Sequence, residues 1–186
     1  MNHHILTTGI SLLQNFANSR KIEIAEAIRR HTQVKEYLFE TPRKASAEIN
    51  SLDVRTGFLE SGKTDLEITL IHTETDAGKC VASLLEKLLK SKKLKVHKIP
   101  VRGFDKPSGD FTAEFAQREA TEALTQMRES VMRHVGNLRR SARPEIELNC
   151  TGGFKAEVAV LYEIGRTLRV PVYYLHESFK VCITLP

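Results

Sequence analysis

A segment late in the sequence combines two glycines with a lysine, residue types that suit an anion site. Residues 149–155 read NCTGGFK and lie between an apolar strand pattern and an apolar helix pattern. Glycines at such a turn let backbone N–H groups approach a ligand, and the start of the helix adds unpaired donors and the positive end of its dipole. Lys155 adds a full charge. The segment predicts a phosphate site, with a tight turn beside a surface lysine as the alternative.

A second strand-to-helix turn near the start carries a glycine and a hydroxyl group. Residues 7–15 read TTGISLLQN, with Gly9 and Ser11 at the turn. The Ser11 hydroxyl could contact a ligand. Alternatively, it could cap the helix by accepting a hydrogen bond from a helix N–H, which requires no ligand.

A third segment matches a known phosphate-binding pattern. Residues 57–64, GFLESGKT, fit the P-loop pattern G-x-x-x-x-G-K-[ST]. A P-loop works because a strand delivers the loop and a helix receives it. Here a helix pattern precedes the match and a strand pattern follows it. We interpret the match as fortuitous, and a P-loop-like nucleotide hydrolase stays as the alternative from a different functional class.

Strand patterns alternate with helix patterns along the chain, in the order β-α-α-β-α-β-α-β-α-β-β. The expected strands cover residues 3–8, 66–72, 94–99, 145–149, 172–175 and 179–185. This alternation predicts an α/β fold of Rossmann-like type, with a mostly parallel sheet, helices on both faces and an antiparallel C-terminal edge strand. We expect one domain, residues 1–186.

The carboxyl ends of parallel strands form the ligand-binding edge in open α/β sheets. Both glycine turns, residues 73–75 and Arg102 follow predicted strands and therefore share this edge. Their convergence favours one phosphate site that includes Ser11 and Lys155.

The composition is that of a globular protein with a mild positive charge. The chain has 186 residues, of which 41% are hydrophobic, and a formal net charge of +5. This charge suits an anionic ligand but is too small to identify a nucleic-acid binder, and we expect no DNA partner. The three cysteines lack C-x-x-C spacing, and no segment resembles a signal peptide or a membrane span. We expect a cytoplasmic protein without a membrane partner.

Few other residues indicate catalysis. The seven histidines show no metal-ligand spacing, and no G-x-G-x-x-G follows the first strand, so we expect neither a metal nor another cofactor. Arg128 and His134 have the R-x₄₋₆-H spacing of HEPN ribonucleases, but both could simply face solvent. A hydroxyl and a lysine over a phosphate cradle remain, and these can hold a phosphodiester in line for attack. In RNA the 2′-OH can itself be the nucleophile.

Three stretches together resemble the CRISPR-associated Rossmann fold (CARF) domain: residues 7–15, 149–155 and 171–177, the last reading PVYYLHE. The resemblance covers the whole chain in its strand order. It implies binding of cyclic oligoadenylate, most simply cyclic tetra-adenylate, at the interface of a two-fold homodimer. A ring of identical nucleotides suits such an interface, because each subunit offers the same surface to half of the ring.

Within this family, the chain most resembles the stand-alone ring nucleases of type III CRISPR systems. The resemblance implies that Ser11 and Lys155 are needed to cleave the ring, without metal, to linear di-adenylate with a 2′,3′-cyclic phosphate. We expect Lys155 to donate to the non-bridging oxygens and Ser11 to orient the phosphate. The alternative is a sensor domain of a larger effector. Ile10 departs from the small or hydroxyl residue frequent in relatives. Around the pair we expect ligand contacts from Gly9, Ile10, Leu12, Asn15, Thr73, Glu74, Thr75, Arg102, Gly103, Thr151, Gly152, Gly153 and Phe154.

Overall fold

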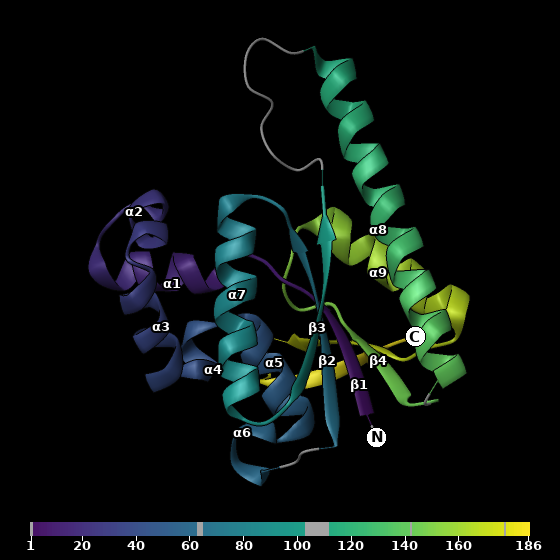
Figure 1. Ribbon diagram of the computed structural model, residues 1–186, viewed down its shortest axis with the longest axis horizontal. Coiled ribbons are helices and arrows are strands. Elements are labelled where there is room, and N and C mark those ends of the chain that lie inside the picture. The colour runs from purple at the N-terminus through teal and green to yellow at the C-terminus, as the bar shows by residue number, and fades with distance from the viewer. Residues whose placement is uncertain (1, 63–64, 103–111, 142, 177) are drawn as a thin grey trace.

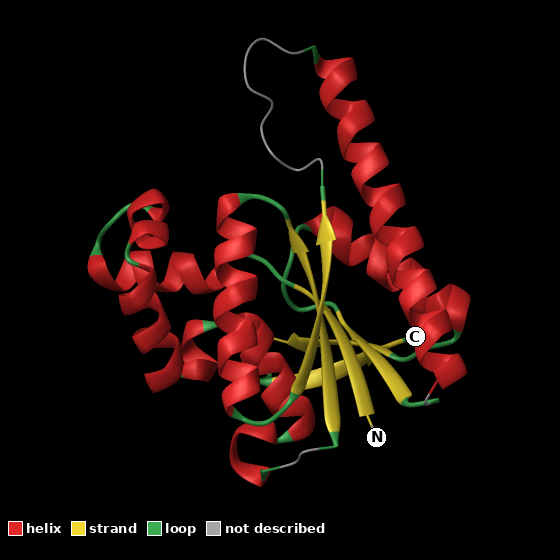
Figure 2. Ribbon diagram, viewed as in Figure 1, coloured by secondary structure: helices red, strands yellow, loops and turns green. Residues whose placement is uncertain are grey.

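A six-stranded sheet organises the described part of the protein, and Figure 1 and Figure 2 show how its strands lie among the helices. The computed structural model describes residues 2–62, 65–102, 112–141, 143–176 and 178–186. The strands are β1 (Asn2–Thr7), β2 (Leu66–Thr73), β3 (Lys95–Val101), β4 (Glu145–Asn149), β5 (Val172–His176) and β6 (Val181–Leu185). Their order across the sheet is β3-β2-β1-β4-β5-β6, in which only β6 pairs antiparallel to its neighbour. The expected Rossmann-like fold with an antiparallel edge strand is confirmed.

Helices cover both faces of the sheet (Figure 2). One face packs against α1 (Ser11–Arg20), α3 (His31–Glu40), α5 (Ala47–Thr56) and α7 (Asp76–Ser91), together with the short α2 (Ile24–Arg29), α4 (Pro42–Ala45) and α6 (Phe58–Ser61). The other face packs against α8 (Ala113–Ser141) and α9 (Lys155–Leu168).

Successive side chains of each strand point to opposite faces, and this alternation divides the core in two. Leu6 and Ile68 lie in the cluster under α1 and α7. Ile5 is one position from Leu6, and Ile71 is three positions from Ile68, so both side chains point to the opposite face. They lie in the cluster under α8 and α9. Because both faces are buried, the strands are apolar on both sides along much of their length.

The structure corrects several expected boundaries. The first connection contains six helical segments within the described residues, not two. Segments of four to six residues, such as α4 and α6, are too short to show a helical period in the sequence. The strand expected at 179–185 begins at Val181, because Lys180 has a positive φ of 54° and belongs to the turn.

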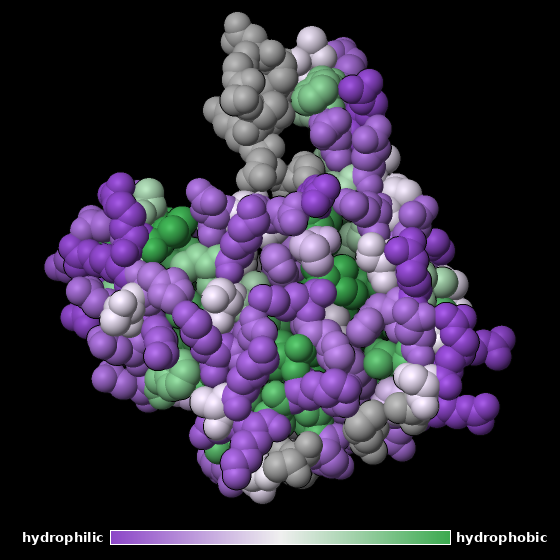
Figure 3. All heavy atoms as spheres, in the orientation of Figure 1, coloured by the Kyte–Doolittle hydropathy of each residue, from purple (hydrophilic) through white to green (hydrophobic). Residues whose placement is uncertain are grey.

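Hydrophilic side chains cover most of the face in Figure 3, and hydrophobic ones show through in small areas between them. The first turns of α8 project beyond the sheet (Figure 1). Among the described residues, no helix combines the length and apolar character that a membrane crossing requires.

Candidate phosphate-binding site

The two glycine turns meet at the point where the strand order reverses. β1 lies between β2 on one side and β4 on the other, and the turns that follow β1 and β4 are therefore neighbours. Ligands of open α/β sheets bind at this switch point. A Cβ atom at Gly9 would lie 2.9 Å from the backbone nitrogen of Gly153, so the two turns touch and leave no room for a side chain. We call residues 9–11 and 151–155 together the glycine cradle.

Glu48, a residue that the sequence did not indicate, lies under the glycine cradle. It belongs to the first turn of α5 and is fully buried. Its Oε1 accepts a hydrogen bond from the Gly9 backbone N–H at 2.7 Å. A Cβ atom at Gly152 would lie only 2.3 Å from the same oxygen. Glu48 therefore supports both halves of the cradle.

Ser11 is the first residue of α1, and its side chain is partly exposed. The helix cap is Ile10, which makes no side-chain cap bond, so the alternative of Ser11 as N-cap is wrong. The Ser11 hydroxyl instead donates to Glu48 Oε2 at 3.0 Å and accepts from the Ala47 backbone N–H at 3.2 Å. Tertiary contacts with the start of α5 thus fix this hydroxyl at the cradle.

The late turn is held by hydrogen bonds within the turn and to β5. Asn149 Oδ1 accepts from the Thr151 N–H at 3.0 Å, and Thr151 Oγ1 accepts from the Leu175 N–H at 2.9 Å. Lys155 begins α9 and is exposed. Its side chain forms no ion pair within the described part of the chain, which leaves its charge available to an anion.

A second buried carboxyl lies behind this turn. Glu157 is 1% exposed, and its Oε2 accepts from the Phe154 N–H at 2.9 Å. Burial raises the pKa of Glu157, and the hydrogen bond from Phe154 opposes this effect. The contact fixes the start of α9, as in a capping box. The Phe154 side chain is 47% exposed at the cradle.

The turn after β2 lies beside the cradle but uses its hydroxyls internally. Thr75 Oγ1 caps α7 by accepting from the Gly78 N–H at 2.9 Å, and it also bonds Thr73 Oγ1 at 2.9 Å. Thr73 is 3% exposed, so its side chain packs within the turn, and its expected contact with the ligand stays a prediction. Arg102 is well exposed and donates to Glu74 Oε2 at 2.7 Å. Arg102 and Glu74 both lie at the carboxyl ends of the strands, as expected. Gly103 lies outside the described residues.

Two further expected ligand contacts are structural. Leu12 is fully buried in the core, so its side chain cannot meet a ligand. The Asn15 amide donates to the backbone oxygens of Lys44 and Ala45, at 3.2 and 3.1 Å. This residue ties α1 to the segment that leads into α5 and therefore helps to place Glu48.

The described residues of the other two sequence motifs lie away from the glycine cradle. The first six residues of the P-loop match are folded around α6 and precede β2, at the edge of the sheet opposite the cradle; Lys63 and Thr64 lie outside the described residues. Arg128 pairs with Glu163 on α9 at 2.9 Å. His134 instead turns toward the sheet and bonds Thr69 at 2.8 Å, so Arg128 and His134 have separate structural partners.

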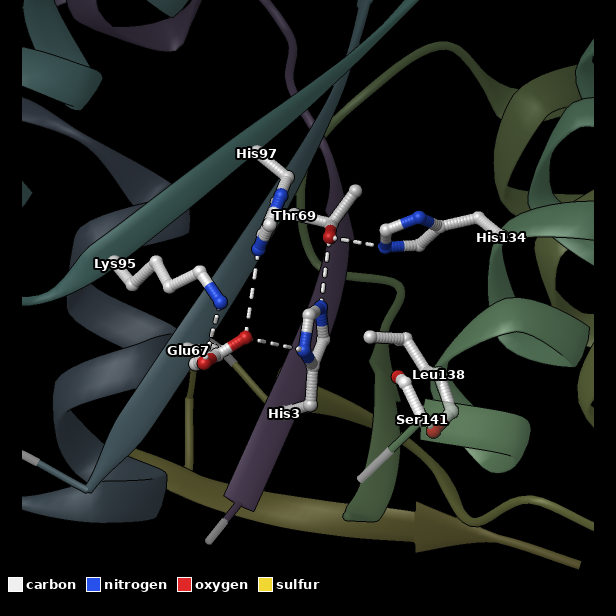
Figure 4. Close-up of polar contacts among 8 residues, drawn as sticks. All are labelled: His3, Glu67, Thr69, Lys95, His97, His134, Leu138 and Ser141. Atoms are coloured by element: carbon white, nitrogen blue, oxygen red, sulfur yellow. Dashed lines mark hydrogen bonds and ion pairs between the residues drawn. The ribbon is translucent and has the colours of Figure 1, made fainter. Parts of the chain in front are cut away.

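His134 belongs to a polar cluster at the amino ends of the strands (Figure 4). The cluster consists of His3, Glu67, Thr69, Lys95, His97 and His134, which we call the histidine cluster. Thr69 Oγ1 bridges His3 Nε2 at 2.7 Å and His134 Nε2 at 2.8 Å. Burial, and then the neighbouring histidines, lower the pKa of His3 to about 3. In the described part of the chain, no group of three or more His, Cys, Asp or Glu side chains is arranged to hold a metal ion.

Comparison with protein families shows the family of this chain. Residues 43–186 match the family described as CRISPR-associated protein (Cas_APE2256). The chain belongs to this family. Comparison with the curated proteins gives no match.

Three solved structures share the fold. Can2 from Sulfobacillus thermosulfidooxidans, in complex with cyclic tetra-adenylate, superposes with a TM-score of 0.52 at 11% identity, over 100% of this chain and 35% of that one. Protein VC1899 from Vibrio cholerae gives 0.55 at 11%, over 99% and 33%. Enterococcus italicus Csm6, bound to cyclic hexa-2′-fluoro-hexa-dAMP, gives 0.53 at 10%, over 100% and 41%. The fold expected from the CARF resemblance is confirmed, and the chain spans between a third and two fifths of these neighbours.

Proposed function

We propose that this protein binds cyclic tetra-adenylate at the interface of a two-fold homodimer and cleaves it without a metal ion. The products are linear di-adenylates that end in a 2′,3′-cyclic phosphate, and their formation switches off type III CRISPR signalling. Ser11 and Lys155 are the residues that act on the phosphodiester.

The observation that carries this proposal is the junction of the two glycine turns. Gly9 and Gly153 touch at the switch point of the sheet, with Ser11 beginning one adjacent helix and Lys155 the other. A phosphate in this place meets the positive ends of two helices and an ammonium group. These are the donors that stabilise charge on a phosphodiester as it is attacked.

The ligand class is supported by the family and by the structural neighbours. The chain belongs to a CRISPR-associated family, and two proteins of the same fold were solved with a cyclic oligonucleotide bound. The exposed Phe154 ring beside the cradle offers a surface on which an adenine can stack.

A second function has its own support. The chain spans only 33–41% of its solved neighbours, so the same fold occurs as one part of larger proteins. In that role the cradle would bind the ring intact and regulate an effector domain elsewhere.

Incubation of the purified protein with cyclic tetra-adenylate in EDTA separates these functions. We expect linear adenylates with cyclic phosphate ends, resolved by chromatography and mass. Loss of one charge-stabilising donor costs on the order of 10²–10³ in rate, so Lys155→Ala should nearly stop cleavage while binding falls less. Ser11→Ala should also lose cleavage.

The matched control is Lys63→Ala, the same substitution in the P-loop match, which should cleave as the wild type does. Tight binding of an intact ring by the wild type would support the sensor function instead. A wild type that binds no ring of any size would refute the ligand assignment.

A further inference from the structure

The hydrogen bonds of Ser11 limit what its hydroxyl can do. A serine hydroxyl has one proton to donate and two lone pairs that accept. Here the proton goes to Glu48 Oε2 at 3.0 Å, and one lone pair accepts from the Ala47 N–H at 3.2 Å. One acceptor position remains, on a side chain that is partly exposed at the cradle. In this arrangement Ser11 can accept a hydrogen bond from a ligand but has no proton left to donate to a phosphate oxygen.

The surroundings of Glu48 favour its role as the acceptor of the Ser11 hydrogen bond. As a carboxylate it only accepts hydrogen bonds, and it takes three: from the Gly9 N–H, the Ser11 hydroxyl and the Ser46 hydroxyl, the last at 2.6 Å. The Ser46 oxygen is itself fixed, because it accepts from the Ile49 N–H as the cap of α5. None of the three donors is a cation, so no full positive charge neutralises the carboxylate through these bonds.

A negative group directly under an anion site opposes binding of the anion, which calls for a role other than affinity. We propose that Glu48 is the positioning residue and final proton acceptor of a relay that activates the 2′-OH of the bound ring through Ser11. The inference rests on the proposed ring cleavage and assigns Ser11 a different role from orienting the phosphate.

The ligand 2′-OH gives its proton to Ser11 Oγ, while the Ser11 proton passes to Glu48 Oε2. The 2′-oxygen forms its bond to phosphorus, and the bond from phosphorus to the 5′-oxygen breaks with its electron pair on that oxygen. The departing 5′-oxygen takes a proton from water, and the hydroxide that remains is neutralised by the proton that Glu48 returns through Ser11, which restores the carboxylate. Lys155 stabilises the charge on the phosphoryl oxygens.

Glu48→Gln tests the relay because it keeps the shape and removes the base. We expect single-turnover cleavage of cyclic tetra-adenylate to fall about 10²–10⁴-fold, the usual contribution of general acid–base catalysis. Binding of the ring with 2′-fluoro riboses, which has no nucleophile, should stay within about threefold of the wild type or tighten, since a negative charge is removed.

The pH dependence of the cleavage rate distinguishes the relay from a purely structural role of Glu48, because loss of a structural contact would not change it. Without its base, Glu48→Gln depends on hydroxide, and its residual rate should rise about tenfold per pH unit between pH 7 and 8.5, more steeply than in the wild type. Glu67→Gln is the matched control, the same change in a buried glutamate at the opposite edge of the sheet, and should cleave normally. Cleavage by Glu48→Gln within tenfold of the wild type, or an equal loss of binding and cleavage, would overturn the relay.

A measurement on the wild type alone covers a Glu48→Gln variant that fails to fold. In mixtures of H₂O and D₂O, a relay that moves two protons gives a curved dependence of the single-turnover rate on deuterium fraction. A linear dependence would overturn the relay while the proposed cleavage stands. A wild type that leaves the ring intact overturns the proposed cleavage, and the relay with it.

Discussion

Glu48 and Glu67 are buried glutamates at opposite ends of the parallel strands, and the two have different surroundings. Glu48, at the carboxyl ends of the strands, accepts hydrogen bonds from a backbone N–H and two hydroxyls under the glycine turns. Glu67, at the amino ends of the strands, accepts a hydrogen bond from Lys95 at 3.0 Å and lies 3.4 Å from His97 Nε2. One carboxylate has neutral donors beside an open cradle, and the other has a cation and imidazoles under α8.

The surroundings determine what each glutamate can do. Burial acts to raise the pKa of Glu67, but hydrogen bonds from Lys95 and His97 outweigh it and hold the pKa below its usual value. Glu67 therefore stays ion-paired with Lys95 and contributes to the stability of the fold. Glu48 has a hydroxyl, not a cation, between it and the ligand edge. A buried carboxylate is available for chemistry where its hydrogen-bond donors can pass a proton on.

Among the changes that test this comparison, closing the space between Glu48 and the cradle should have the largest effect. In Gly152→Ala the new Cβ would lie 2.3 Å from Glu48 Oε1 and 2.7 Å from its Cδ, so the carboxylate must move. A displacement of about 1 Å at an active site costs on the order of 10² in rate, and we expect such a loss in single-turnover cleavage. Gly136→Ala in α8, where no atom lies within 4 Å of the new Cβ, is the control and should cleave normally. Normal cleavage by Gly152→Ala would show that Glu48 need not lie where it does.

The next effect concerns acid stability and belongs to the histidine cluster. His3 is fully buried, with its pKa lowered to about 3, first by burial and then by His134 and His97. Its neutral form is the one that folds, so this stability is present above the unfolded pKa of 6.5 and is lost as the pH falls toward 3. We expect a loss of about 2–3 kcal/mol from this group between pH 6.5 and 4.5.

Urea unfolding of the wild type and of His3→Gln at both pH values measures this contribution as the difference in their pH dependence. His4, whose pKa burial lowers to about 4, titrates on the other face of the sheet and is common to both proteins. Equal pH dependence in the two proteins would contradict the assignment to His3.

The smallest effect should follow from removing the hydroxyl that joins two histidines. Thr69→Val leaves the Nε2 atoms of His3 and His134 without their partner, which costs about 1–2 kcal/mol of unfolding free energy. Thr69→Ser, which keeps the hydroxyl, is the control. Cleavage per folded molecule should be unchanged, since the histidine cluster lies at the edge opposite the cradle. A cleavage defect in Thr69→Val would break the separation of the two regions.

The sequence by itself determined the strands and their neighbouring turns. Alternating apolar residues and glycine turns are local signals, because they report the backbone conformation and burial of residues a few positions apart. The turns at Gly9 and Gly153, the exposed Lys155 at a helix start and the parallel sheet could all be predicted in this way. The four-residue helices α4 and α6 could not, since no period develops over so few residues.

Only the tertiary structure decided which of these residues work together. Glu48 bonds Gly9 across 39 positions of sequence and lies against Gly152, more than a hundred positions further on. No local pattern encodes these contacts, because they depend on the placing of β1 between β2 and β4 and on the packing of α5 beneath the turns. For the same reason Leu12 and Thr73 were expected at the ligand, whereas packing buries their side chains. Local sequence fixes which groups stand at the end of each strand, and the order of the strands fixes which of them meet.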